Sequence, residues 1–265
     1  MNENFTSLVF FTVLSQTAVG ALIFRWLVLL RGGLEFTPSD FRRISLIVIA
    51  LLLFLSLAIA FLHLGNPLHA YNALNNLRKS WLSREIFSLS LLMATLLINY
   101  MFFTKNNYEI KEILFSVISI ILGISLIYCM IKLYMLPLVI TWNNPFTPVS
   151  FIITTFLCGI VLLVVITGRN YNSYHSITLP LIAVLIISSI INSILFPGSF
   201  FKQGFNLFII RTALSILSLL IIALIFFKTQ SNKTFIWWVI LFVTVMSSEI
   251  INRYIFFLSF EKSGL

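Results

Sequence analysis

The chain has 265 residues, of which 60% are apolar and only 9% are charged, and its mean hydropathy is +1.05. A soluble domain carries roughly 25% charged residues, so this composition excludes a water-soluble globule and predicts an integral membrane protein. The net charge of +9 does not indicate a nucleic-acid partner, because the basic residues are scattered singly and form no dense patch.

Eight segments of the sequence are each apolar and long enough to cross the ~30 Å hydrocarbon layer of a membrane. Eight spans of ~20 residues use ~160 residues, and short loops take up most of the rest. We therefore expect an all-α, polytopic membrane helix bundle that forms a single transmembrane domain over residues 1–265. The predicted spans are 6–30, 43–64, 84–103, 112–136, 147–167, 176–196, 206–228 and 234–259.

The first span follows a start that lacks Lys and Arg, and its apolar run contains no A-x-A cleavage pattern, so we interpret it as an uncleaved helix. An even number of spans places both termini on one side. The positive-inside rule then predicts a multi-pass protein of the bacterial inner membrane with both termini on the outer, periplasmic face. The loops after odd-numbered spans carry eight basic residues, Arg31, Arg42, Arg43, Lys105, Lys111, Arg169, Lys228 and Lys233, against five on the other face, Arg78, Lys79, Arg84, Lys202 and Lys262.

The longest loop, 65–83, shows internal order. Asn66 and Pro67 are typical of a helix start, and apolar residues then recur every three or four positions as far as Trp81. Polar residues fall mostly between them. This pattern predicts a short amphipathic helix over 67–81 that lies in the membrane interface.

Ionisable residues within membrane spans are rare and informative. His63 ends the second span and Glu85 starts the third, so the loop between them returns both to a similar depth. An imidazole and a carboxylate placed there could bind the two hydroxyls of a quinol and accept its protons. The alternative is that Glu85 only complements the helix dipole and that His63 bonds a loop carbonyl, and residue chemistry leaves both interpretations open.

Glu249 and Arg253 lie four residues apart on the eighth span, where they share one helical face and can form an ion pair. We favour this structural interpretation over a binding role. Arg211 in the seventh span either joins the pair or extends toward the membrane surface. Gln16 in the first span could hydrogen-bond between helices, and Arg25 near the end of that span is expected to reach the surface.

The histidine count argues against a haem. Haem b in a membrane anchor needs His ligands from facing helices, and of His63, His69 and His175 only His63 approaches a span. Cys129 and Cys158 fall inside apolar runs without metal-ligand spacing, so we expect packed thiols and no metal site.

Several stretches of this sequence are similar to the membrane-anchor subunit family of bacterial dimethyl sulfoxide (DMSO) reductase. The most specific is the element L-H-L-G-x-P at 62–67, followed by S-x-E at 83–85. The others are Phe11 to Gly20, Ala70 to Asn75, Thr141-Trp142, Thr147-Pro148 and Glu249 to Arg253.

This resemblance implies a role in anaerobic respiration. Anchors of the family oxidise menaquinol, contain no haem, and pass electrons to an iron–sulfur subunit that feeds a molybdopterin catalytic subunit. The quinol-binding histidine and glutamate of the family fall on His63 and Glu85. By the same resemblance, iron–sulfur clusters and molybdopterin belong to partner subunits, and the anchor alone is not a complete enzyme.

Two other functions compete with this one. A secondary transporter of a small solute is the main alternative, but no two spans share the Gly/Pro interruptions that mark a broken-helix substrate site. An intramembrane hydrolase is disfavoured because no Ser/His set and no pair of Asp residues lies at a shared depth.

Overall fold

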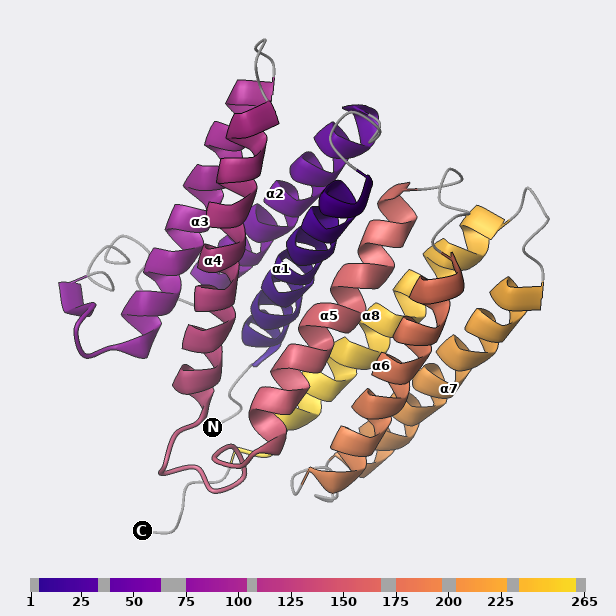
Figure 1. The fold of residues 1–265 in the computed structure, drawn as a ribbon. Coiled ribbons are helices and arrows are strands. Elements are labelled where there is room, and N and C mark those ends of the chain that lie inside the picture. Colours follow the sequence, from indigo (N-terminus) through magenta and orange to yellow (C-terminus); the bar gives the residue numbers. More distant parts are fainter. Residues whose placement is uncertain are drawn as a thin grey trace.

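The structure is a computed structural model that describes residues 5–32, 39–62, 75–103, 109–167, 175–196, 204–227 and 234–260. Over these residues the chain is all helical, with eight helices arranged as one bundle (Figure 1). The helices are α1 (Thr6–Gly32), α2 (Ser39–Leu62), α3 (Trp81–Phe103), α4 (Glu109–Tyr134), α5 (Phe146–Thr167), α6 (His175–Leu195), α7 (Phe205–Phe227) and α8 (Thr234–Leu258).

All eight helices are long and apolar enough to cross a membrane, which confirms the predicted fold class. The protein is therefore a multi-pass membrane protein. Each helix agrees with a predicted span to within a few residues, because hydropathy summed over ~20 residues identifies a span better than it identifies the span's ends.

The predicted amphipathic helix over 67–81 is only partly inside the described residues. For the described part of this segment the prediction is wrong. Residues 75–80 form a short 3₁₀ turn and a hydrogen-bonded turn rather than a continuous helix. The Ser80 hydroxyl accepts a hydrogen bond from the Ser83 backbone N–H at 3.3 Å. Ser80 is thus the N-cap that starts α3 at Trp81, which a serine in this position favours.

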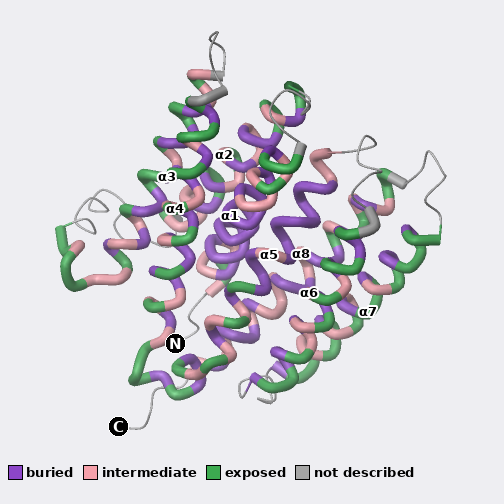
Figure 2. Tube along the Cα trace, viewed as in Figure 1, coloured by how far each residue is buried: buried purple, intermediate pink, exposed green. Residues whose placement is uncertain are grey.

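Helices α1 and α5 form the centre of the bundle, where both are largely buried (Figure 2). Their close approach depends on two glycines. A Cβ on Gly20 would meet the Thr155 carbonyl oxygen at 1.8 Å, and one on Gly159 would meet the Gly20 carbonyl carbon at 2.3 Å. Small residues of this kind let helix backbones touch in a membrane, where packing replaces the hydrophobic effect as the force between helices.

The connection between α4 and α5 is fastened to the end of α8. The Trp142 indole Nε1 donates to the Phe256 carbonyl at 2.8 Å, and the Thr141 hydroxyl donates to the Ser259 carbonyl at 2.5 Å. Trp142 also stacks on the Phe256 ring with 5.0 Å between centroids. These contacts tie the two halves of the bundle, α1–α4 and α5–α8, together at one end.

The starts of α1, α3, α5 and α7 and the ends of α2, α4, α6 and α8 lie at the same end of the bundle, here called the terminal face (Figure 1). Glu85 is four residues from the start of α3, and Arg253 is five residues from the end of α8. Both therefore lie about one to one and a half helical turns inside the terminal face.

Candidate functional site

Glu85 is one of three carboxylates that the described residues bury within the bundle, together with Glu112 and Glu249. It is 1% exposed and lies in the second turn of α3. The preceding residue fixes the start of the helix. The Arg84 Nε donates to the Leu77 carbonyl at 2.9 Å, and its guanidinium lies 4.2 Å from the centroid of the Trp81 ring. Arg84 is thus directed away from Glu85.

The Glu85 Oε1 atom has no hydrogen-bond partner among the described residues, and no described basic side chain forms an ion pair with the carboxyl group. A buried carboxyl oxygen without a partner costs free energy, and native structures contain few such atoms. An orphan oxygen of this kind is expected where a protein reserves a group for a ligand or for catalysis. Of the three buried carboxylates, Glu85 is the one with an oxygen that has neither a hydrogen bond nor an ion pair among the described residues, and it is therefore the candidate site residue.

Helix α4 forms one side of the surroundings of Glu85. Trp81 packs edge-on against Tyr128 with 5.7 Å between ring centroids, which holds the start of α3 against the end of α4. Cys129 and Tyr134, both buried, lie within electrostatic range of the Glu85 carboxyl. The surroundings of Glu85 near the terminal face thus include a thiol and a phenol.

His63, the other half of the predicted pair, lies outside the described residues. Helix α2 ends at Leu62, directly before it, and α3 starts at Trp81. The polypeptide therefore leaves α2 and enters α3 at the terminal face, as the sequence predicted. The pairing of His63 with Glu85 stays a prediction.

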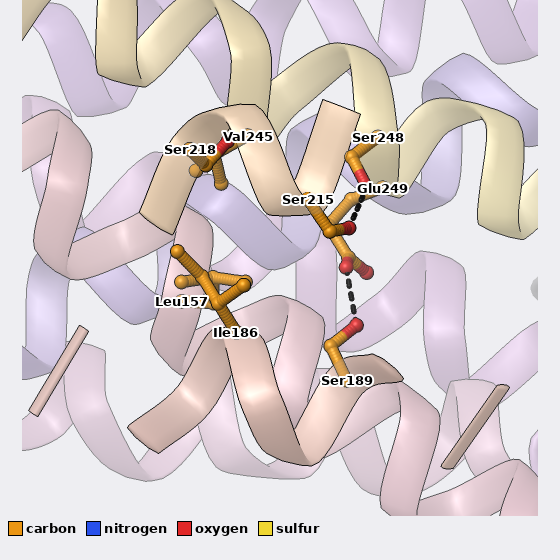
Figure 3. Close-up of a pocket in the computed structure, with 8 residues that line it drawn as sticks. All are labelled: Leu157, Ile186, Ser189, Ser215, Ser218, Val245, Ser248 and Glu249. Carbon is orange, nitrogen blue, oxygen red and sulfur yellow. Dashed lines mark hydrogen bonds between the residues drawn. The ribbon is translucent and has the colours of Figure 1, made fainter. Parts of the chain in front are cut away.

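Glu249 on α8 has the opposite environment. Its carboxylate accepts hydrogen bonds from the Thr154 hydroxyl at 2.7 Å, the Ser189 hydroxyl at 2.6 Å and the Asn252 amide at 3.4 Å. Figure 3 shows the Ser189 hydroxyl pointing at this carboxylate. The Arg211 guanidinium lies 3.8 Å away. Four partners from α5, α6, α7 and α8 itself thus meet at one buried carboxylate.

The space around Glu249 is small. No water-sized sphere fits between the side chains that line it. Two hydroxyl contacts follow it in one row between α7 and α8, with Ser215 2.8 Å from Ser248 (Figure 3) and Ser218 3.0 Å from Thr244. The arrangement is that of a filled polar joint between helices rather than a ligand pocket.

The predicted ion pair between Glu249 and Arg253 is wrong, because Glu249 pairs with Arg211 instead. Arg253 donates from Nη2 to the Gln16 side-chain oxygen at 2.9 Å, and its guanidinium lies 3.7 Å from the centroid of the Phe151 ring. A shared helical face allows an i,i+4 pair, but a long arginine side chain reaches whichever neighbour its rotamer favours. Gln16 thus joins α1 to α8, as predicted.

The family-model comparison matches residues 1–216 to "DMSO reductase anchor subunit (DmsC)". The protein belongs to this family. The matched range contains His63, Glu85 and Arg211 and ends before Glu249 and Arg253 on α8.

Curated relatives of this anchor-family protein are similar over most of its length. A chain of the anaerobic dimethyl sulfoxide reductase of Haemophilus influenzae is 28% identical over 78% of this sequence and 72% of its own length. A chain of the Escherichia coli enzyme of the same name is 28% identical over 70% of this sequence and 66% of its own length. A subunit of the sulfite dehydrogenase of Allochromatium vinosum is 26% identical over 62% of this sequence and 55% of its own length.

This anchor-family protein also has a buried ionic cluster that the sequence did not suggest. Arg25 is fully buried and does not reach the surface as expected. It donates to Glu112 on α4 at 2.5 Å, and Arg42 on α2 lies 2.7 Å from the other oxygen of that carboxylate. Sequence reasoning missed Glu112 because a carboxylate at the start of a span is ordinary beside the membrane surface. The signal that could have found it is its place on the same side of the membrane as Arg25 and Arg42.

No group of three or more His, Cys, Asp or Glu side chains that could hold a metal ion occurs within the described part of the protein. Cys129 and Cys158 are both buried free thiols, as expected. His63 and His69 lie outside that part, and the side chain of His175 does too, so the predicted absence of haem stays a prediction.

Proposed function

We propose that this protein is the quinol-oxidising membrane anchor of a DMSO reductase-type molybdoenzyme complex. In this proposal it takes electrons from menaquinol and passes them to a ferredoxin-like iron–sulfur subunit that feeds a molybdopterin catalytic subunit. Membership of the anchor subunit family supports the anchoring role. The observation that supports the quinol site is the buried Glu85 oxygen without a partner.

Glu85 supplies the acceptor that quinol oxidation requires. A quinol has two hydroxyls, and its oxidation releases two electrons and two protons to give the quinone. The Glu85 carboxylate accepts a hydrogen bond from one hydroxyl and takes its proton, and His63 does the same for the other hydroxyl, directly or through water. The electrons pass one at a time to an iron–sulfur cluster of the partner subunit, which docks on the terminal face.

The terminal face is the outer, periplasmic face in this proposal. The positive-inside count supports this orientation, and Glu85 lies near the same face as the start of α1 and the end of α8. Protons released from the quinol leave on the side where the iron–sulfur subunit docks. Turnover is therefore expected to add little or nothing to the proton gradient.

Orientation can be measured by cysteine labelling. Asn75→Cys tests the terminal face, where Asn75 lies on an exposed turn. Asn106→Cys tests the other face, because position 106 falls in the sequence between the end of α3 and the start of α4. The native Cys129 and Cys158 are buried, so they give little background. A membrane-impermeant maleimide added to intact cells should label position 75 and not position 106. Labelling of position 106 alone would overturn the orientation.

The site itself is tested by Glu85→Gln and His63→Ala in the assembled complex. Losing a hydrogen bond to a charged group costs ~1.5–3 kcal/mol, so quinol-driven turnover should fall roughly 10- to 150-fold. Reduction with a soluble artificial donor should be unchanged, because that route bypasses the anchor. Ser90→Ala is a matched control on α3, since the exposed Ser90 hydroxyl bonds only its own helix at the Ile86 carbonyl.

The two donors separate a site defect from an assembly defect. A variant that loses activity with both donors has failed to assemble. Assembled Glu85→Gln and His63→Ala complexes that keep full quinol-driven turnover would show that the quinol site lies elsewhere. The cofactor prediction is tested on the purified anchor, which should show no b-type haem absorption.

A further inference from the structure

An apolar groove of about 540 Å³ runs between α2 and α3 on the outside of the bundle. Buried Leu46 and Leu96 form its floor, and the exposed side chains of Leu51, Phe54 and Leu97 form its rims. On the α2 side the lining includes Ala50, a small, half-buried residue whose side chain fills little of the groove. The lining side chains are apolar except for the Tyr100 hydroxyl.

The groove lies on the same side of α3 as Glu85. Leu96 follows Glu85 by eleven residues, which is about three helical turns, so the two share one side of α3. Met93, the lining residue of α3 nearest to Glu85 in the sequence, is eight residues or ~12 Å further along the helix. The groove thus begins about half a membrane thickness below the carboxyl group and extends toward the opposite face.

A polar contact lies at the far end of the groove. The Arg43 Nη2 atom lies 3.4 Å from the Tyr100 hydroxyl and donates to it, near the start of α2 and the end of α3 on the opposite face. The groove therefore has a polar contact at the end near the opposite face, and its apolar end points along α3 toward Glu85.

We infer that this groove holds the isoprenoid tail of the quinol whose ring binds at Glu85. This inference rests on the proposed function. A quinol ring at Glu85 must send its tail into the hydrocarbon layer, and the α2–α3 groove is the apolar recess on the same side of α3. The tail is already in hydrocarbon before it binds, so the groove contributes close packing and a fixed direction rather than the hydrophobic effect.

Filling the groove should therefore affect the binding of tailed quinols alone. Ala50→Trp places a large side chain in the groove far from Glu85. For a naphthoquinol with a multi-isoprene tail, KM should rise roughly tenfold with kcat unchanged. For tailless menadiol, KM and kcat should both stay at the values of the parent complex. Ala223→Trp on the lipid-facing side of α7 is the matched control and should change neither quinol.

A second variant tests the inference if Ala50→Trp does not fold. Leu97→Ala removes a rim side chain that is 57% exposed, so it should fold normally and raise KM for the tailed quinol a few-fold. If Ala50→Trp and Leu97→Ala leave KM for the tailed quinol unchanged, or shift tailed and tailless quinols equally, the groove holds membrane lipid and the inference fails. Failure of the proposed function looks different, because Glu85→Gln would then leave turnover of both quinols intact.

Discussion

Glu85 in the α1–α4 half and Glu249 in the α5–α8 half are both buried carboxylates on membrane-spanning helices, and their environments are opposite. Glu249 has three hydrogen-bond donors and an arginine around it, in a space that admits no water-sized sphere. Glu85 has an oxygen without a partner among the described residues and lies on the side of α3 that continues into an apolar groove.

The difference shows how two residues of one type serve two purposes. A buried charge is tolerated when neighbouring groups satisfy it. The hydrogen bonds and the ion pair of Glu249 offset the free-energy cost of burying its carboxylate, and they connect four helices. A buried carboxyl oxygen without a partner has no such interaction to offset the cost of its burial while no ligand is bound. It becomes favourable when a ligand donates the missing hydrogen bond, which is the role proposed for Glu85.

The largest predicted effect is on stability and concerns Glu249. Glu249→Leu removes the charge that faces Arg211 and leaves a buried, unpaired guanidinium, which should destabilise the protein by about 3–5 kcal/mol. Arg211→Met should cost a similar amount for the converse reason. Thermal unfolding in mild detergent and the yield of folded protein measure both. The double variant should be milder than the sum of the single changes, and strict additivity would contradict the pairing.

A smaller effect is expected along the hydroxyl contacts beside Glu249. Ser215→Ala removes the 2.8 Å contact with Ser248 and should cost about 0.6 kcal/mol, the average for side-chain hydrogen bonds between membrane helices. Ser248→Ala should cost a similar amount. The double variant, followed in the same unfolding assay, should lose little more than either single change. If the double variant instead lost several kcal/mol of unfolding free energy, the Ser215–Ser248 contact would matter as much to the fold as Glu249.

The smallest effect on stability is expected at Glu85. Glu85→Leu replaces a buried carboxyl group that has an unsatisfied oxygen with a side chain of similar size. The free energy of unfolding should therefore fall by less than about 0.5 kcal/mol or rise. Quinol-driven turnover should nevertheless collapse. The same unfolding assay used for Glu249→Leu measures the contrast. A destabilisation comparable to that of Glu249→Leu would mean that Glu85 also has a structural role.

Much of the fold could be predicted from the sequence because hydropathy is local. A run of ~20 apolar residues cannot remain in water and has few ways to satisfy its backbone in lipid, so the eight spans follow residue by residue. The alternation of the spans also placed the start of α1, the end of α8 and Glu85 at the start of α3 near one face. The rarity of charge within the spans identified Glu85, Arg211, Glu249 and Arg253 as the residues to examine.

Only the tertiary structure decided which of these residues meet. Whether Glu249 pairs with Arg253 or Arg211, and whether Arg25 reaches the surface or Glu112, depends on how each helix is rotated and which helix lies beside it. Sequence spacing fixes the face that a residue shares within its own helix but not the partner across the interface. The unpaired oxygen of Glu85 is likewise a property of the assembled bundle, because a group lacks a partner only when every neighbouring helix has been placed.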